Sequence, residues 1–243
     1  MKTVLVTGAS SGIGRTIAKE FANNGYAVAI NYNKSKQDAI SLLDEITSIN
    51  GVAMLCKADV GNQDEVSKMV DDVLKEFGHI DVLVNNAGIS LKGLFIDESY
   101  VDMINIVNTN LISAINLSKK VIPSMIENEK GRIINISSIW GNVGGSMEVS
   151  YSTSKAGIIG LTKSLAKEYG YNNINVNCIC PGAIDTQMNN NLTSKERTEL
   201  ITQIPAGRLG KTEEVAKLVL FLAEDTGDYI NGQVITIDGG FTL

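Results

Sequence analysis

The chain has 243 residues, of which 44% are hydrophobic and 20% charged, and this balance excludes a globally disordered protein. Its net charge of −6 argues against a general binder of nucleic acid or anionic membranes, which needs a basic face. The single histidine, His79, excludes sites built on two histidines, and three cysteines without a C-x-x-C spacing favour a reducing compartment. No apolar run is long enough for a secretory signal or a membrane span, so we expect a cytoplasmic protein without a metal site.

Short apolar runs rich in β-branched residues alternate with longer segments of helical periodicity. The predicted strands are Thr3–Val6, Ala27–Asn31, Val52–Cys56, Val82–Val84, Arg132–Ile136, Ile174–Ile179 and Val234–Ile237. The predicted helices between them are Gly14–Asn24, Lys36–Ile49, Asp64–Phe77, Tyr100–Ile126, Ser152–Tyr169 and Glu213–Ala223. Continuously apolar strands that alternate with helices are typical of a parallel sheet covered on both faces. We therefore predict one α/β domain over residues 1–243, a doubly wound parallel sheet of about seven strands flanked by helices.

The segment Gly182–Lys211 is the least regular part of the chain and lies between a predicted strand and the last predicted helix. Long insertions at such places often move over a binding site. We interpret residues 182–211 as a substrate loop that acts as a mobile lid; a merely tolerated surface loop is the alternative.

A glycine-rich motif, Thr7–Gly14, follows the first predicted strand and opens the first predicted helix. Its glycines have the spacing G-x-x-x-G-x-G, which differs from the G-x-G-x-x-G fingerprint. Glycines at this place allow a tight turn and bring backbone N–H groups close to a pyrophosphate at the helix N-terminus. The motif favours a nucleotide site over an ordinary strand-to-helix turn.

Two further segments fall on the same edge of the predicted sheet. Asn85-Asn86-Ala87-Gly88 follows the fourth strand, where Gly88 would let the chain pass close to a cofactor. Asp59-Val60 follows the third strand, and Asp59 either accepts a hydrogen bond from an adenine amino group or caps the next helix.

Tyr151 and Lys155 are four residues apart at the start of a predicted helix and therefore share one face. An ammonium beside a phenol favours the phenolate and lowers the tyrosine pKa, so the pair can transfer protons. Spacing alone favours an ordinary surface pair, but Ser137-Ser138 ends the preceding predicted strand and supports a catalytic interpretation.

Thr7–Gly14, Asn85–Gly88, Ser138, Tyr151-x-x-x-Lys155 and Pro181-Gly182 together resemble the short-chain dehydrogenase/reductase family over essentially the whole chain. The resemblance implies a Rossmann-type fold and an NAD(P)-dependent oxidoreductase acting on CH–OH and C=O groups. It also implies four catalytic residues, with the roles that follow. Ser138 stabilises the carbonyl oxygen, Tyr151 exchanges a proton with it, Lys155 lowers the tyrosine pKa and holds the ribose, and Asn110 fixes a water.

The resemblance and the motifs together define a cofactor site along the carboxyl edge of the sheet. Its predicted residues are Gly8, Ser10, Ser11, Gly12, Ile13, Gly14, Asn31, Asn33, Lys34, Asp59, Val60, Asn86, Ala87, Gly88, Tyr151, Lys155, Pro181, Gly182, Ile184 and Thr186. Ser138 and Tyr151 would also contact the substrate.

The end of the second strand bears on the choice between the two nicotinamide cofactors. NAD enzymes of this fold carry an acidic residue there, whereas this chain has Asn33-Lys34-Ser35, which can accept a 2′-phosphate. This favours NADP(H), with NAD(H) not excluded, although Ser11 stands where NADP-using members often have a basic residue. Alternatively, Lys34 and Lys36 merely begin a solvated helix.

Ile204–Gly210 and the ending Asp238-Gly239-Gly240 are most similar to bacterial beta-ketoacyl-ACP reductases. This implies a 3-oxoacyl-[acyl-carrier-protein] reductase in fatty acid synthesis. Sugar, polyol or quinone-type reductases share such segments and remain the alternative. A catalytically silent nucleotide-binding sensor is a further alternative of another class. The net charge of −6 and the acidic Glu127-Asn128-Glu129 predict weak electrostatic steering of an acidic carrier.

The family resemblance also implies a homotetramer, and we expect neither nucleic acid nor membrane as a partner. The long helices Tyr100–Ile126 and Ser152–Tyr169 resemble those that pair across family interfaces. Ala156, Gly157 and Gly160 would permit close approach of a second helix, or only pack within the chain.

Overall fold

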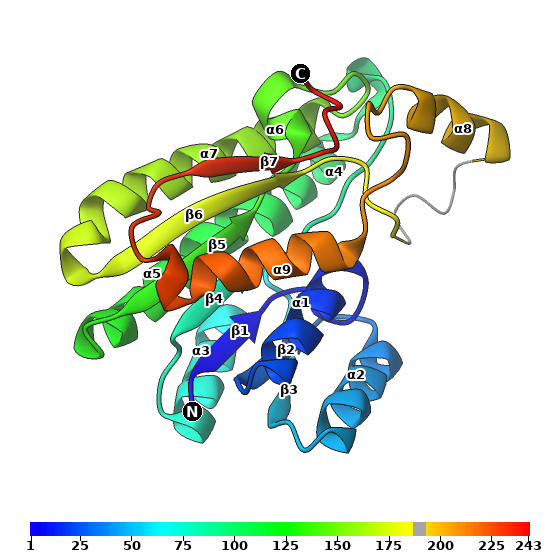
Figure 1. The fold of residues 1–243 in the computed structure, drawn as a ribbon. Helices are drawn as coiled ribbons and strands as arrows, with labels where there is room; N and C mark the ends of the chain where they lie inside the picture. The colour runs from blue at the N-terminus through cyan, green and yellow to red at the C-terminus, as the bar shows by residue number, and fades with distance from the viewer. Residues whose placement is uncertain (187–192) are drawn as a thin grey trace.

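The strands form one parallel sheet with the order β3-β2-β1-β4-β5-β6-β7 (Figure 1) in the computed structural model, which describes residues 1–186 and 193–243. Every neighbouring pair of strands is parallel. The strands are β1 (Thr3–Val6), β2 (Ala27–Tyr32), β3 (Ala53–Lys57), β4 (Val82–Asn85), β5 (Gly131–Ile136), β6 (Ile174–Pro181) and β7 (Val234–Ile237). The predicted fold class is confirmed.

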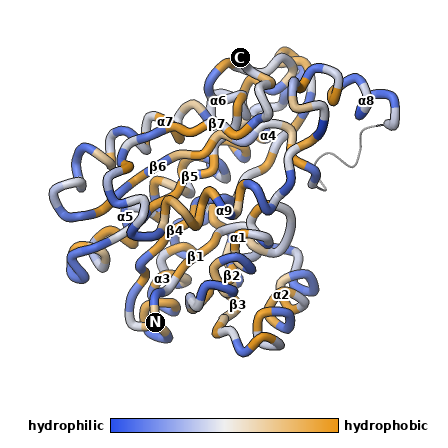
Figure 2. Tube along the Cα trace, viewed as in Figure 1, coloured by the Kyte–Doolittle hydropathy of each residue, from blue (hydrophilic) through white to orange (hydrophobic). Residues whose placement is uncertain are grey.

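Helices cover both faces of the sheet. On one face lie α1 (Gly12–Asn23), α2 (Lys36–Ser48) and α9 (Thr212–Ala223), and on the other lie α3 (Gln63–Phe77), α5 (Ser113–Glu127) and α7 (Val149–Tyr169). The apolar tube segments run through the middle of the molecule in Figure 2, where strands and helices meet. In β4, for example, Val82 and Val84 face the first layer and Leu83 the second, as the two-residue period of a strand requires.

The strand order reverses at β1, because β2 lies on one side of it and β4 on the other. At such a point the loops after the two strands leave in opposite directions and open a crevice at the carboxyl edge. The loops after β1, β4, β5 and β6 therefore surround one place, and these loops carry the predicted functional motifs.

The predicted helix Tyr100–Ile126 is one helical run with an internal change of geometry. It consists of α4 (Tyr100–Val107), a π-helical turn at Asn108–Ile112 and then α5. A π-turn inserts one extra residue into a helix, and hydrophobic periodicity does not reveal so local a change.

Two short helices were not predicted: α6 (Ile139–Val143), directly after β5, and α8 (Ser194–Thr202) within the predicted substrate loop. The description of residues 182–211 as irregular is therefore wrong for α8. Its polar sequence shows almost no periodicity, but Thr193 and Glu196 form a capping box that starts it. The part of the loop at residues 187–192, including the whole of its asparagine run, lies outside the described residues.

Within the described residues there are also the short turns η1 (Phe95–Asp97), η3 (Gly170–Asn172) and η5 (Asp225–Gly227), beside the π-turn η2 (Asn108–Ile112). Within the described residues, no helix combines the length and apolarity that crossing a membrane requires.

Candidate active site

The turn between β1 and α1 is built on glycines that no other residue could replace without strain. Gly8 and Gly12 have φ angles of +62° and +55°, in the left-handed region. A Cβ on Gly8 would lie 3.0 Å from the Cα of Ala87, and one on Gly14 would collide with the Asn86 amide nitrogen and the Gly8 carbonyl oxygen. The turn therefore packs its backbone directly against the loop after β4.

The N-terminus of α1 has the chemistry of an anion site. Within the described residues the Ser11 side chain, at the N-cap, forms no capping hydrogen bond, and the first turn carries no acid. The first N–H groups of the helix thus remain available as donors at its positive end. A glycine turn with free N–H donors fits the pyrophosphate of a dinucleotide.

Two asparagines hold this turn in place. The Asn86 side chain donates hydrogen bonds to the Thr7 and Gly8 carbonyl oxygens, at 2.9 and 3.3 Å. The Asn31 side chain accepts a bond from the Gly8 N–H at 3.1 Å and donates to the Cys56 and Ala58 carbonyl oxygens. Asn31 is 2% exposed, and its side chain supports Gly8 against the sheet. Its predicted place among the cofactor residues stays a prediction.

The residues predicted for the adenosine end lie along the exposed ends of β2 and β3. Asn33 and Lys34 are exposed, and no ion pair of Lys34 occurs in the described part of the chain. Asp59 accepts a bond from the Gly61 N–H, and Asn62 rather than Asp59 caps α3. The capping alternative for Asp59 is therefore wrong. The Val60 side chain is buried in the core, which leaves only its backbone for a ligand.

Ser138, Tyr151 and Lys155 come together at the ends of β5 and α7. Ser138 is the N-cap of α6, and its hydroxyl accepts a bond from the Trp140 N–H at 3.2 Å and lies close enough to the Tyr151 phenol to lower the pKa of that group. The Lys155 ammonium lies 5.7 Å from the centroid of the Tyr151 ring and donates a bond to the Ile136 carbonyl oxygen at 2.8 Å. Ser137 Oγ bonds the Lys155 carbonyl oxygen at 2.8 Å, which ties α7 to the end of β5.

Burial dominates the protonation of this group. It raises the pKa of Tyr151 to about 12, while the Ser138 hydroxyl opposes this rise and the Glu148 carboxylate adds to it. Burial also lowers the pKa of Lys155 to about 8. We predicted that Lys155 lowers the tyrosine pKa, but in this structure the ammonium is engaged with Ile136 and the effect of burial prevails. Tyr151 is therefore a protonated acid at neutral pH, the form that can give a proton to a carbonyl oxygen.

The π-turn brings Asn110 to the same group. Asn110 Oδ1 accepts a bond from the Ile89 N–H at 2.8 Å, and Nδ2 donates to the Ile89 carbonyl oxygen at 2.9 Å and to Ser154 Oγ at 3.0 Å. A Cβ on Gly88 would lie 3.3 Å from Lys155 Nζ and 3.4 Å from Asn110 Oδ1. The amide group of Asn110 is thus engaged with Ile89 and Ser154. Its predicted role of fixing a water stays a prediction.

The residues predicted for the nicotinamide end close the site from the side of β6. The Gly182 N–H donates to the Ile237 carbonyl oxygen at 3.0 Å, and Ile184 forms a parallel bridge with Gly210. Thr186 Cγ2 lies 3.7 Å from where a Gly12 Cβ would be. The segment after β6 thus returns to the glycine turn, so the structure gathers its predicted site residues along one edge.

Sequence analysis missed two supporting hydroxyls. Thr7 Oγ1 accepts bonds from the Asn86 and Ala87 N–H groups and donates to the Val84 carbonyl oxygen, which joins the loops after β1 and β4. Ser154 links Asn110 to the Tyr151 carbonyl oxygen. Thr7 begins the glycine motif and could have been found there, whereas nothing in the sequence near Ser154 signals its role.

Comparison with known proteins agrees with this geometry. A family model described as "Enoyl-(Acyl carrier protein) reductase" matches residues 8–242. The 3-oxoacyl-[acyl-carrier-protein] reductase FabG of Staphylococcus aureus strain Mu50 is 41% identical over 242 residues, covering 100% of this chain and 98% of that protein. The FabG proteins of Thermotoga maritima and Chlamydia trachomatis serovar D are 41% and 45% identical, over 100% and 98% of this chain and 98% and 96% of their own lengths.

Proposed function

We propose a specific activity on the premise that the chain belongs to the short-chain dehydrogenase/reductase family and so is an oxidoreductase of carbonyl and hydroxyl groups. The proposed activity is that of an NADPH-dependent 3-oxoacyl-[acyl-carrier-protein] reductase of fatty acid synthesis. The observation that carries the proposal is the meeting of Ser138, Tyr151 and Lys155 beside the glycine turn. The relatives that cover the whole chain bear this activity in their names.

The reaction divides between the cofactor and the protein. When bound, a nicotinamide would supply the hydride for the carbonyl carbon. The Ser138 hydroxyl donates a hydrogen bond to the carbonyl oxygen as negative charge develops there. Tyr151, protonated because burial raises its pKa to about 12, then gives its proton to that oxygen. The Lys155 ammonium stabilises the tyrosinate left behind and holds the ribose hydroxyls.

The preference for NADP(H) rests on the end of β2. Lys34 is exposed there beside Asn33 and Ser35, and a carboxylate that would repel a 2′-phosphate is missing from this stretch of sequence. We expect kcat/KM for NADPH to exceed that for NADH by at least about tenfold, as one charge-assisted phosphate contact would give. Equal or better turnover with NADH at matched concentrations would contradict the preference.

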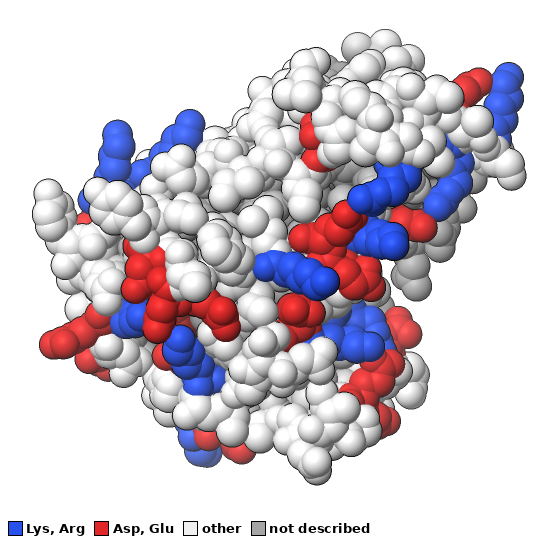
Figure 3. Space-filling model, in the orientation of Figure 1, with Lys and Arg blue, Asp and Glu red and all other residues white. Residues whose placement is uncertain are grey.

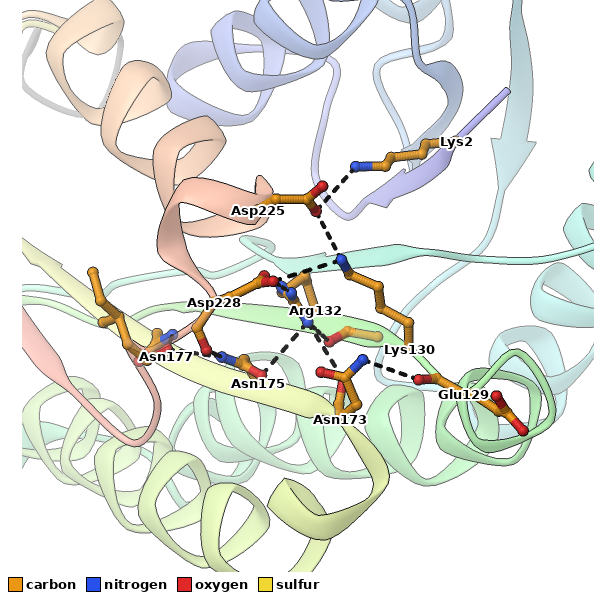
Figure 4. A network of polar contacts seen from close by, with 11 residues as sticks. Lys2, Glu129, Lys130, Arg132, Asn173, Asn175, Asn177, Asp225 and Asp228 are labelled. Carbon is orange, nitrogen blue, oxygen red and sulfur yellow. Dashed lines mark hydrogen bonds and ion pairs between the residues drawn. The ribbon is translucent and has the colours of Figure 1, made fainter.

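The location of the acidic residues bears on a carrier-bound substrate. Glu129 and Asn173 lie at the amino edge of the sheet, in the network of Figure 4, away from Ser138 at the carboxyl edge. Basic and acidic side chains are interspersed on the face in Figure 3 rather than forming one field. Near the site, for example, Arg208 and Arg197 are paired with Glu214 and Asp185. A carrier would therefore be recognised by local contacts more than by steering.

A substrate panel decides among the candidate activities. It contains acetoacetyl-ACP, acetoacetyl thioesters without the carrier, a trans-2-enoyl thioester, and free sugar, polyol and quinone-type carbonyls. We expect turnover of both acetoacetyl compounds, with the carrier-bound form preferred. A lack of activity on every 3-oxoacyl thioester would refute the proposed substrate and leave a reductase of another small carbonyl, or a silent nucleotide-binding sensor if no carbonyl is reduced.

Assembly as a homotetramer is part of the proposal. A groove of about 520 Å³ between α5 and α7 is lined mostly by apolar side chains, Ile122 and Leu165 among them. Gly157 packs internally, since a Cβ there would lie 2.6 Å from Leu111 Cδ2, whereas a Cβ on Gly160 would meet nothing within 4 Å among the described residues. Gly160 thus leaves room for a second copy, and Ala156 is exposed on the same helix. A monomeric mass in light scattering at micromolar concentration would contradict this assembly.

The remaining elements of the proposal concern the substrate loop and the compartment. We place the loop of residues 182–211, which contains α8, over the substrate. We place the enzyme in the cytoplasm, in keeping with three cysteines that are all buried as free thiols.

A further inference from the structure

Two serine–glutamate pairs join the segment just before Tyr151 to the loop after β4. Ser90 Oγ donates to Glu148 Oε1, and Ser150 Oγ donates to Glu98 Oε2, each at 2.5 Å. Each segment thus supplies one hydroxyl and one carboxylate. Hydrogen bonds from a hydroxyl to a carboxylate at this distance are of the short, charge-assisted kind, about twice as strong as neutral ones. We call these four residues the clasp.

The clasp holds a backbone that is not relaxed. Met147, one residue before Glu148, has a φ angle of +64°, in a region that side-chain-bearing residues rarely adopt. Its carbonyl oxygen accepts a bond from the Gly93 N–H at 2.9 Å, between the two serine–glutamate pairs. Three bonds therefore fasten the start of α7 to one loop, and they compensate for the strain at Met147.

The same loop forms the opposite wall of the site. Its Gly88 lies against Lys155 and Asn110, and its Ile89 backbone is held on both sides by Asn110. Ser90 follows Ile89 directly, and its hydroxyl donates the hydrogen bond to Glu148. The contacts therefore run from Asn110 through Ile89 and Ser90 to Glu148. A shift of this pair would change the distance between the loop and Tyr151.

We propose that Glu148 is a positioning residue, which through Ser90 sets the Tyr151 hydroxyl at the start of α7 against the loop after β4. The inference rests on the proposed function only in assuming that Tyr151 gives the proton. Glu148 occupies the N-cap position of α7 without capping it, because its carboxylate is engaged with Ser90 instead. The second pair, Ser150 with Glu98, holds the next turn of backbone and keeps the fold intact when the first is removed.

The kinetic test compares S90A, E148A and the double variant with S99A. Ser99 donates to Asp102 at 2.7 Å, also a serine–carboxylate pair, but the pair lies wholly at the start of α4 and is not joined to α7. We expect S90A and E148A to lower kcat about tenfold with the KM for NADPH within about twofold, because small displacements of a proton donor cost rate rather than binding. The double variant should be no slower than the slower single variant, and S99A should match the unmodified protein.

E148Q separates position from charge. Glutamine keeps an acceptor oxygen for Ser90, so we expect it to restore kcat to within about threefold of the unmodified protein. Unchanged kcat in E148A and S90A, or losses that multiply in the double variant, would overturn the proposal.

A measurement that does not depend on activity can show whether this inference fails or whether only the proposed function fails. Hydrogen exchange in the protein without substrate should quicken in S90A and E148A at the Gly93 amide and in residues 148–152, but not in S99A. Unaltered exchange in both segments overturns the coupling, whatever substrate the enzyme uses. Faster exchange with no 3-oxoacyl turnover would support the coupling and refute only the substrate.

Discussion

The two edges of the sheet use buried polar groups in opposite ways. At the amino edge, Arg132 is 2% exposed and is paired with Asp228, and Lys130 joins Asp225 to the same network (Figure 4). At the carboxyl edge, Lys155 is buried and Tyr151 half-buried, and burial disfavours the charged form of each side chain. The first edge neutralises charge for stability, and the second keeps protons available for chemistry. Variants at each edge should therefore separate stability from activity.

The largest effect is expected at the carboxyl edge. Y151F removes the proton donor but keeps the ring, so we expect kcat to fall at least about a thousandfold while NADPH affinity stays within about threefold. Steady-state kinetics and fluorescence titration of NADPH measure both. Turnover that survives the substitution would refute the proposed mechanism.

D228N should show the reverse pattern at the amino edge. It leaves the buried Arg132 guanidinium without its anion, and in the described chain the Nε of Arg132 already has no hydrogen-bond partner. We expect the free energy of unfolding to fall by about 2 kcal/mol, less than for a fully buried pair because Asp228 is half-exposed, with kcat within about twofold. Urea denaturation and kinetics on the folded fraction test this. A loss of activity without a loss of stability would remove the contrast between the edges.

The glycine turn between β1 and α1 can be tested against a second glycine, because Gly25 also has a positive φ angle but lies outside the site. G8A and G25A both place alanine at a positive φ, +62° and +79°, but only Gly8 lies against the loop after β4. G25A should lose about 1 kcal/mol of stability, and G8A more than that, because its Cβ would also crowd the Ala87 backbone. Only G8A should weaken NADPH binding, by at least about tenfold. Calorimetry of cofactor binding distinguishes them. Equal NADPH affinities in the two variants would mean that the turn does not hold the cofactor.

The smallest effect concerns charge near Tyr151. The tyrosine is faced by Glu148 and Lys155 from α7, by Ser138 from the end of β5 and by Cys180 from β6. Glu148 raises the tyrosine pKa, so E148Q should lower it and move the pH midpoint of alcohol oxidation to lower pH, by less than about one unit. E98Q is the control, because Glu98 is not among the groups that shift this pKa. A midpoint that moves upward would contradict the sign.

The sequence revealed the sheet because its strands are continuously apolar, and it placed the glycine turn, Ser138, Tyr151 and Lys155 at the ends of those strands. It did not reveal the directions of side chains. Asn31 ends a strand as a cofactor residue would, yet its amide turns inward to Gly8. The pKa of Tyr151 depends on burial, which spacing from Lys155 does not report. Within the clasp, Ser90 and Glu148 are far apart in sequence and meet only in the folded chain, so no local sequence pattern predicts their contact.

The π-turn at Asn108–Ile112 also has a geometric consequence for the helix that contains it. Each helical residue rotates the chain by about 100°, so one extra residue offsets the phase of everything before it relative to everything after it. The apolar stripe of α5 can therefore follow the sheet, through Leu117 and Val121, while α4 presents Ile106 on a different azimuth. Deleting one residue here would restore a regular period and rotate α4 out of alignment. The π-turn thus sets the rotation of α4 relative to α5 about the helix axis. The number of residues in this segment therefore matters more for the packing of both helices than the identity of each residue.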